Sequence, residues 1–224
     1  MPLCSRACRK ETTLSPREQA IVAMAAFTAN GELERLGAAL NQGLDTGLTV
    51  NEVKEILVQM YAYAGFPRSL GAIGVLMGVV EERRARGIQD EEGRDASPTP
   101  DGLDRDTYGD RVRAELAGLD EGHATKAPYQ EFAPIIDTFL KEHLFADIFV
   151  RDVLTHQERE LATIACLAAL GGVEGPLAFH MAAAMNTGLS GEQMSDFVRG
   201  LDACVGPVRA ESARRVLVRV VAER

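Results

Sequence analysis

Thr155-His156-Gln157-Glu158 and Ser15-Pro16-Arg17-Glu18 begin two stretches of similar pattern in the two halves of this chain. Each places a hydroxyl three residues before a Glu, which is the capping box that begins an α-helix. Each follows a Leu, at 14 and 154. Position 15 thus corresponds to position 155, and further helix signals recur at nearly the same spacing.

A second pair of caps follows each of these two helix starts. Gly47-Leu48-Thr49 leads to Glu52, and Gly188-Leu189-Ser190 leads to Gln193, so that position 49 corresponds to position 190. A glycine ends one helix here and a hydroxyl caps the next. The same offset carries Gly65 onto Gly206, after which Pro67 and Pro207 begin the next helix. The recurrence predicts a duplicated unit.

Apolar residues recur at three- and four-residue spacing, and strand-like alternation is almost absent, so the predicted fold is all-α with two tandem helical-bundle repeats. The domains expected are an N-terminal tail (1–13), a first repeat (14–87), an acidic connector (88–128) and a second repeat with extra leading helices (129–224). The predicted helices are 15–30, 32–46, 49–64 and 67–86, then 155–170, 174–187, 190–204 and 207–222. An extra pair is expected near 129–142 and 144–152, and a short helix near 110–116 within a solvated connector.

Charge and hydropathy limit the partners of the chain. With 224 residues, a net charge of -9 and no clustered Lys and Arg, it is not expected to bind nucleic acid. No apolar stretch approaches the roughly 20 residues that span a bilayer, so no membrane partner is expected. The first residues lack the apolar region of a secretory signal, which predicts a cytoplasmic protein. Small molecules and other proteins are the expected partners.

The four cysteines, at 4, 8, 166 and 204, match neither a zinc site nor a disulfide framework. Cys166 and Cys204 lie in apolar helical patterns, where a small buried side chain is the ordinary interpretation. Cys4 and Cys8 form a CxxxC pair in the N-terminal tail. No metal site is predicted.

Two stretches resemble the carboxymuconolactone decarboxylase family. In the second half they are Leu161 to Gly171, then Glu174, then His180-Met181-Ala182-Ala183-Ala184-Met185-Asn186-Thr187-Gly188-Leu189. In the first half, Ala38 to Gly43, Gly47 to Thr49 and Tyr61 to Arg68 resemble the same family. The resemblance implies the fold of alkylhydroperoxidase D-like proteins, which belong to the same family.

The resemblance leaves two kinds of chemistry to compare. The peroxidase branch carries a Glu, a CxxC pair and a His, and here Glu160 and His180 approximate the first and last of these. Val173 and Pro176 stand at the two cysteine positions, and neither can supply a thiolate. The decarboxylase branch implies a carboxylated lactone that serves as its own electron sink, so that no cofactor is needed. The enzyme then stabilises an oxyanion and returns a proton to carbon.

His180 is the predicted proton donor, since an imidazole titrates near neutral pH. Leu177 and Ala184 lie on the same helical face, which places the ring at the border of the apolar stripe. Glu160 and Glu174 are the further catalytic candidates. The predicted substrate-binding residues are Arg68 and Arg159, whose guanidinium groups suit a carboxylate, and Tyr61 and Tyr63.

Structural interpretations compete with each of these roles. His180 suits a hydrogen-bonded residue of the interior, Glu160 a surface ion pair or subunit contact, and Glu174 the stabilisation of a helix start. The two tyrosines suit ordinary packing. In the first repeat the counterpart of His180 is Ala39, so one functional site per chain is expected.

Three functions follow as hypotheses. The first is a cofactor-independent decarboxylase or related lactone-processing enzyme. The second is a peroxide reductase that uses Cys4 and Cys8 or Cys166, and the third is a non-catalytic binding protein. The family resemblance also implies a homo-oligomer, and two fused repeats predict a trimer.

Overall fold

The computed structural model describes residues 13–119 and 127–224, and within them every regular element is helical. The first repeat contains α1 (Pro16–Asn30), α2 (Leu33–Asp45), α3 (Val50–Gln59), α4 (Tyr61–Ala64) and α5 (Phe66–Ala85). The second contains α9 (His156–Leu170), α10 (Glu174–Asn186), α11 (Gly191–Val205) and α12 (Pro207–Ala222). The predicted all-α fold with two tandem repeats is confirmed.

The caps found in the sequence begin the corresponding helices of both repeats. Ser15 and Thr155 form capping boxes with Glu18 and Glu158, and Thr49 and Ser190 do the same at α3 and α11. One predicted boundary is wrong, because the helix expected over 49–64 is divided into α3 and α4 at Met60. Before α5 and α12, Gly65 and Gly206 adopt φ of 84° and 78°, a left-handed conformation that favours glycine.

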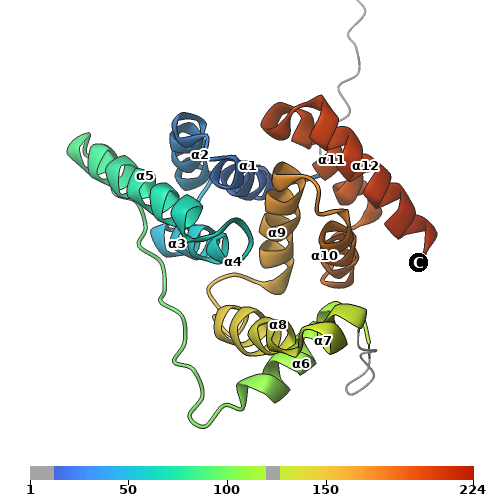
Figure 1. Ribbon diagram of the computed structural model, residues 1–224. Helices are drawn as coiled ribbons and strands as arrows, with labels where there is room; N and C mark the ends of the chain where they lie inside the picture. Colours follow the sequence, from blue (N-terminus) through green and yellow to red (C-terminus); the bar gives the residue numbers. More distant parts are fainter. Residues whose placement is uncertain (1–12, 120–126) are drawn as a thin grey trace, which may run out of the picture.

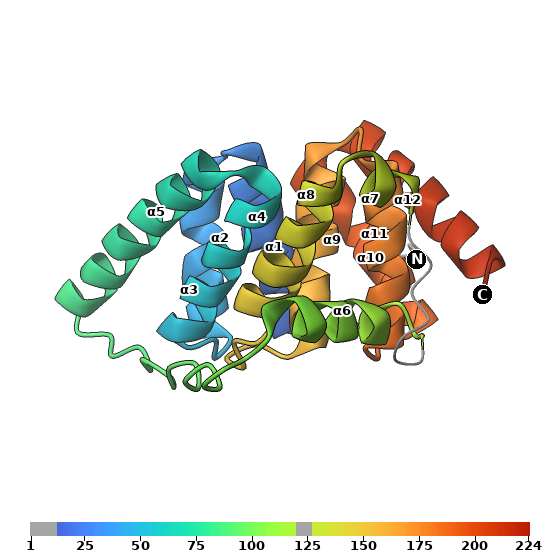
Figure 2. The ribbon, with the colours of Figure 1, turned by 60° about the horizontal axis from the view of Figure 1, so that its bottom comes forward.

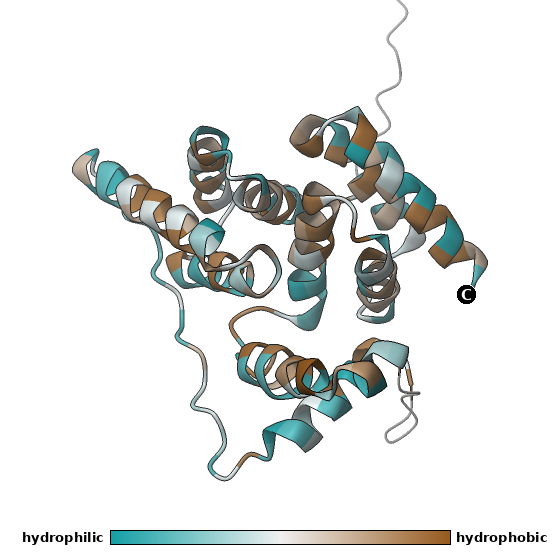
Figure 3. Ribbon diagram, viewed as in Figure 1, coloured by the Kyte–Doolittle hydropathy of each residue, from teal (hydrophilic) through white to brown (hydrophobic). Residues whose placement is uncertain are grey.

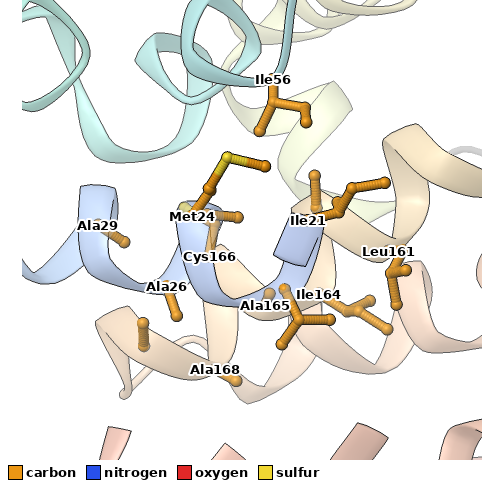
Figure 4. Packing of buried hydrophobic residues seen from close by; sticks show 14 of the residues in the cluster. Ile21, Met24, Ala26, Ala29, Ile56, Leu161, Ile164, Ala165, Cys166 and Ala168 are labelled. Carbon is orange, nitrogen blue, oxygen red and sulfur yellow. The ribbon is translucent and has the colours of Figure 1, made fainter. Parts of the chain in front are cut away.

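The two repeats join along α1 and α9, which lie side by side at the centre of the molecule (Figures 1 and 2). Their facing surfaces are rich in alanine, and small side chains let the helix backbones approach each other closely. Ala26 and Ala165 are fully buried there, beside Ile21 and Ile164 (Figure 4). The helices α5 and α12 lie at opposite outer ends (Figure 2). The core is therefore shared between the repeats.

The segment between the repeats forms α6 (Arg105–Leu116), α7 (Pro128–Phe132), α8 (Pro134–Thr138) and η1 (Phe139–Ile148), a π-helix. The predicted break near residue 143 is wrong, because helical structure continues from Pro134 to Ile148. The break lies instead at Ala133, with φ -134° and ψ 75°. Proline lacks an amide hydrogen and disfavours the α conformation in the residue before it, which places the break before Pro134.

The connector is only partly solvated, because α6 is longer than predicted and packs against η1. Val112 and Leu116 of α6 form a second apolar cluster with Leu144, Phe145 and Ile148. The two helices approach so closely at Gly109 that a Cβ atom there would lie 1.9 Å from the carbonyl oxygen of Lys141. Further upstream, the carbonyl oxygens of Glu91 and Glu92 accept hydrogen bonds from the first amides of α3.

Among the described residues, no helix combines the length and apolarity needed to cross a membrane. Apolar side chains are nevertheless exposed where α7 leads into α8 and η1, which show brown ribbon at the bottom of Figure 3. They include Phe132, Ile135, Ile136 and Phe139.

Candidate active site

Glu160 and His180 form a hydrogen-bonded pair between α9 and α10. His180 Nδ1 lies 2.7 Å from Glu160 Oε2, and His180 and Glu160 are 5% and 0% exposed. A buried carboxylate is costly unless it is paired, and the imidazole provides the partner. Because a carboxylate accepts hydrogen bonds, the contact suits an imidazole that carries its hydrogen on Nδ1. Two catalytic candidates predicted from the sequence are thus in direct contact.

Two aromatic rings hold the imidazole edge-on. The Tyr63 and Phe179 ring centroids lie 5.5 Å and 5.1 Å from that of His180, with interplanar angles of 83° and 86°. Tyr63 belongs to α4 of the first repeat, so the site is built from both repeats. Among the described residues, His180 Nε2 has no hydrogen-bond partner and is not one of the fully enclosed unpaired atoms. This nitrogen is therefore the one that can exchange a proton outside the pair.

Arg159, the neighbour of Glu160 in α9, is fully buried in a polar network between the repeats. Its Nη1 donates to Gln59 Oε1 at 2.8 Å, and its Nη2 donates to Glu55 Oε2 at 3.1 Å and to the carbonyl oxygen of Arg151 at 2.5 Å. The Phe149 ring lies 5.9 Å from the guanidinium carbon. These partners are protein groups, so in this structure the guanidinium ties α9 to α3. Its predicted role in substrate binding stays a prediction.

Glu55 is the carboxylate that pairs with Arg159 in this network. Burial by itself would raise the pKa of this carboxyl, but the hydrogen bonds from Arg151 and Arg159 outweigh it and hold the pKa below the ordinary value of 4.5. Glu55 therefore stays ionised within the interface of the repeats at neutral pH.

The remaining predicted residues lie apart from the pair. Glu174 is exposed at the start of α10 and accepts a hydrogen bond of 3.2 Å from Ser212. Arg68 is exposed in the first turn of α5, with its guanidinium beside Gly31. Tyr61 stacks on Phe66 with a centroid separation of 4.6 Å. Of the predicted set, the structure brings together Glu160, His180 and Tyr63, with Arg159 next in the chain to Glu160.

Sequence reasoning missed Glu55, Gln59 and Thr163. Gln59 Nε2 donates to Thr163 Oγ1 and to the carbonyl oxygen of Arg159, both at 2.9 Å. Glu55 and Gln59 sit among Val53, Ile56 and Leu57 on α3, and polar residues within an apolar pattern are a weak signal of buried polar contacts. Nothing local to α3 shows that the partners come from the other repeat.

The thiol chemistry of the peroxidase branch has little support in the described residues. Cys166 is buried in the core, and burial raises the pKa of its thiol to about 12, which keeps it protonated at neutral pH. Val173 is the N-cap residue of α10 and Pro176 lies in its first turn, so neither position carries a thiol. Cys4 and Cys8 lie outside the described residues.

The two best-defined cavities of the described part of the chain are not lined by His180. The larger, of about 450 Å³, lies between α1, α2 and α11, where Gln19, Asp196, Gly200 and Cys204 line it. When the repeats are aligned by their helix caps, these four correspond to Arg159, Glu55, Gln59 and Tyr63. The cavity, which is lined by both repeats, is thus the counterpart of the polar network beside His180. The enclosed pocket expected at His180 is not among these two cavities.

The repeat architecture agrees with the comparison to known families. The model of the carboxymuconolactone decarboxylase family matches residues 3–77 and 135–219, which together make up more than half of the chain. The chain belongs to the carboxymuconolactone decarboxylase family. Both matched segments correspond to the repeats, while α6 and α7 lie outside them.

Solved structures support the fold of this family member. A protein from Burkholderia xenovorans LB400, described provisionally as a gamma-carboxymuconolactone decarboxylase subunit, matches with a TM-score of 0.54 and 18% identity. The match covers 95% of this chain and 81% of the other. At this identity the likeness concerns the fold alone. No curated protein matches the chain significantly.

Proposed function

We propose that this family member is a cofactor-independent decarboxylase, or an enzyme of a related reaction, that acts on a small carboxylated lactone with His180 as the proton donor. The observation that carries the proposal is the 2.7 Å contact between His180 Nδ1 and Glu160 Oε2 in an almost enclosed place. The family assignment supports the substrate class.

The proposed reaction uses the lactone as its own electron sink. The bond between the ring carbon and the carboxylate breaks, CO2 leaves, and the electron pair is delocalised onto the lactone carbonyl oxygen. His180 Nε2 then delivers a proton to carbon and is reprotonated from solvent. Glu160 fixes the other ring nitrogen and stabilises the imidazolium form, so that Nε2 keeps its direction. Binding of the substrate carboxylate by Arg68 or Arg159 belongs to the same proposal.

A His180→Ala variant tests this role. With gamma-carboxymuconolactone as the first substrate, we expect turnover to fall by roughly 10² to 10⁴, the usual contribution of a positioned acid or base. Release of CO2 and loss of the substrate are the measurements, and circular dichroism checks that the helices remain.

The matched control is His143→Ala. His143 is exposed and pairs with Asp147 at 3.0 Å on η1, away from Glu160. We expect this variant to keep wild-type turnover. Unchanged turnover in His180→Ala would reject the role of His180, and a wild-type protein that turns over no carboxylated lactone would favour the non-catalytic alternative.

We also propose that the chain forms a homo-oligomer, with a trimer as the expected state. Phe132, Ile135 and Phe139 are 93%, 60% and 58% exposed, and clustered apolar side chains of this kind favour contact with a partner. Sedimentation equilibrium measures the mass directly. A stable monomer of 24.2 kDa would contradict the proposal.

A further inference from the structure

Unpaired polar atoms occur on Glu160 and on two residues near it, Tyr63 and Arg159. Among the described residues, four side-chain nitrogen or oxygen atoms are fully enclosed without a hydrogen-bond partner. Three of the four are the Tyr63 hydroxyl, Glu160 Oε1 and Arg159 Nε. Two are donors and one is an acceptor. Because leaving a buried polar group unpaired costs about 1–3 kcal/mol, each of these three atoms requires a polar partner.

The Tyr63 hydroxyl is suited to donate toward Glu160. Burial raises the pKa of this phenol well above 10, and the negative charge of Glu160 raises it further, so the hydroxyl keeps its proton. Thr163 lies near enough to lower the pKa of this phenol in part, although not in the geometry of a hydrogen bond, and Cys166 and Arg159 act on it through their charges. Thr163 Oγ1 already donates to the carbonyl oxygen of Arg159 and accepts from Gln59. Glu160 Oε1 is the enclosed acceptor that has no donor.

The duplication supplies a second observation. In the alignment that pairs the helix caps, Glu160 corresponds to Ala20, His180 to Ala39 and Tyr63 to Cys204. The acid, the imidazole and the phenol are therefore all absent from the other copy of the scaffold. Tyr63 is contributed by the first repeat, so its presence at this site is not a consequence of the local sequence of α9 or α10. Within the duplication, the three side chains therefore occur together only at this site.

We propose that Tyr63 is a positioning residue of the Glu160–His180 pair, and that its hydroxyl holds Glu160 Oε1 through one enclosed water molecule. Such a water needs two to four polar partners, and the three enclosed atoms supply donors and an acceptor for it. The link holds the carboxylate in the rotamer that turns Oε2 to Nδ1. The Tyr63 ring contacts His180 edge-on, and the proposed role does not require contact with the substrate. The catalytic meaning of this link rests on the proposed function, but the link itself does not.

Hydrogen exchange at His180 Nδ1 tests the link without any substrate. In the wild-type protein, nuclear magnetic resonance should detect the Nδ1 hydrogen held by Glu160. In Tyr63→Phe the ring keeps its packing but loses the hydroxyl, and the carboxylate is less firmly held. We expect exchange of this hydrogen to be about tenfold faster, the effect of losing one hydrogen bond.

Tyr61→Phe is the matched control, because Tyr61 lies on the same short helix and stacks on Phe66 instead of His180. In Tyr61→Phe we expect the Nδ1 hydrogen of His180 to exchange at the wild-type rate. Equal rates in Tyr63→Phe and the wild type, within a factor of two, would overturn the proposal. Where turnover is measurable, Tyr63→Phe should lower kcat by about tenfold and leave KM unchanged, since the substrate contacts are intact.

A high-resolution crystal structure of the wild-type protein gives a second, independent test. We expect density for one water within hydrogen-bond distance of the Tyr63 hydroxyl and Glu160 Oε1. A hydroxyl bonded to Thr163 alone, with no link to Glu160, would contradict the proposal. If the water is present and no lactone is turned over, the proposed function fails while the positioning role stands.

Discussion

The two repeats share their helix caps but differ where they face each other. On one side Arg159, Glu55 and Gln59 form a hydrogen-bonded network next to Glu160 and His180. On the other side, the corresponding Gln19, Asp196 and Gly200 border a cavity of about 450 Å³. A duplicated scaffold thus tolerates opposite solutions at equivalent places, because helix caps act locally whereas side chains between the repeats are free to differ. The proposed chemistry lies on the side where Glu160 and His180 are buried and paired.

Of the changes that test this contrast, Arg159→Met is expected to have the largest effect on stability. The change removes the guanidinium from Gln59, Glu55 and the carbonyl oxygen of Arg151, and leaves these buried groups short of a partner. We expect the free energy of unfolding to fall by about 3–5 kcal/mol, as for other broken buried pairs. Urea denaturation followed by circular dichroism is the measurement.

Gln19→Met is the control at the equivalent position of the first repeat. Gln19 is exposed and makes one hydrogen bond, of 2.7 Å, to the carbonyl oxygen of Leu14. A surface change of this kind is expected to cost about 0.5 kcal/mol or less. Similar losses in the two variants would show that the Arg159 network between the repeats has no special weight in stability.

A smaller effect on stability is expected when the pH is lowered. Since the pKa of Glu55 is held below its ordinary value of 4.5, its ion pairs stabilise the folded protein fully above that pH. This contribution is lost as the pH falls from 4.5 through the lower folded-state pKa, because the unfolded chain then binds a proton that the folded protein does not. Between pH 6 and pH 3, wild-type stability should fall by about 1 kcal/mol more than that of Glu55→Gln.

Urea midpoints across this pH range provide the measurement. The Glu55→Gln variant is expected to be less stable at neutral pH, since Arg151 and Arg159 lose a charged partner. Its stability should nevertheless depend less on pH. Parallel curves of stability against pH for the wild type and Glu55→Gln would mean that the pKa of Glu55 is the same in the folded and unfolded protein.

Much of the fold was accessible from the sequence, and the site only in part. Capping boxes at Ser15 and Thr155 predicted helix starts within a residue, because a cap depends on four consecutive residues. The break lies at Ala133 and not near residue 143 as predicted, although Pro134 is a local signal for it. Glu160 and His180 were predicted as candidates, but their contact was not predicted, since it joins two helices.

The sequence by itself determined the helical class, the duplication and the presence of an imidazole in only one repeat. These features are local or periodic, so their physical causes lie within a few turns of chain. Only the tertiary structure decided that Tyr63 of the first repeat contacts His180, and that Arg159 turns inward to Gln59 and Glu55. Such contacts depend on how α9 docks against the first repeat, where burial makes each polar group require a partner.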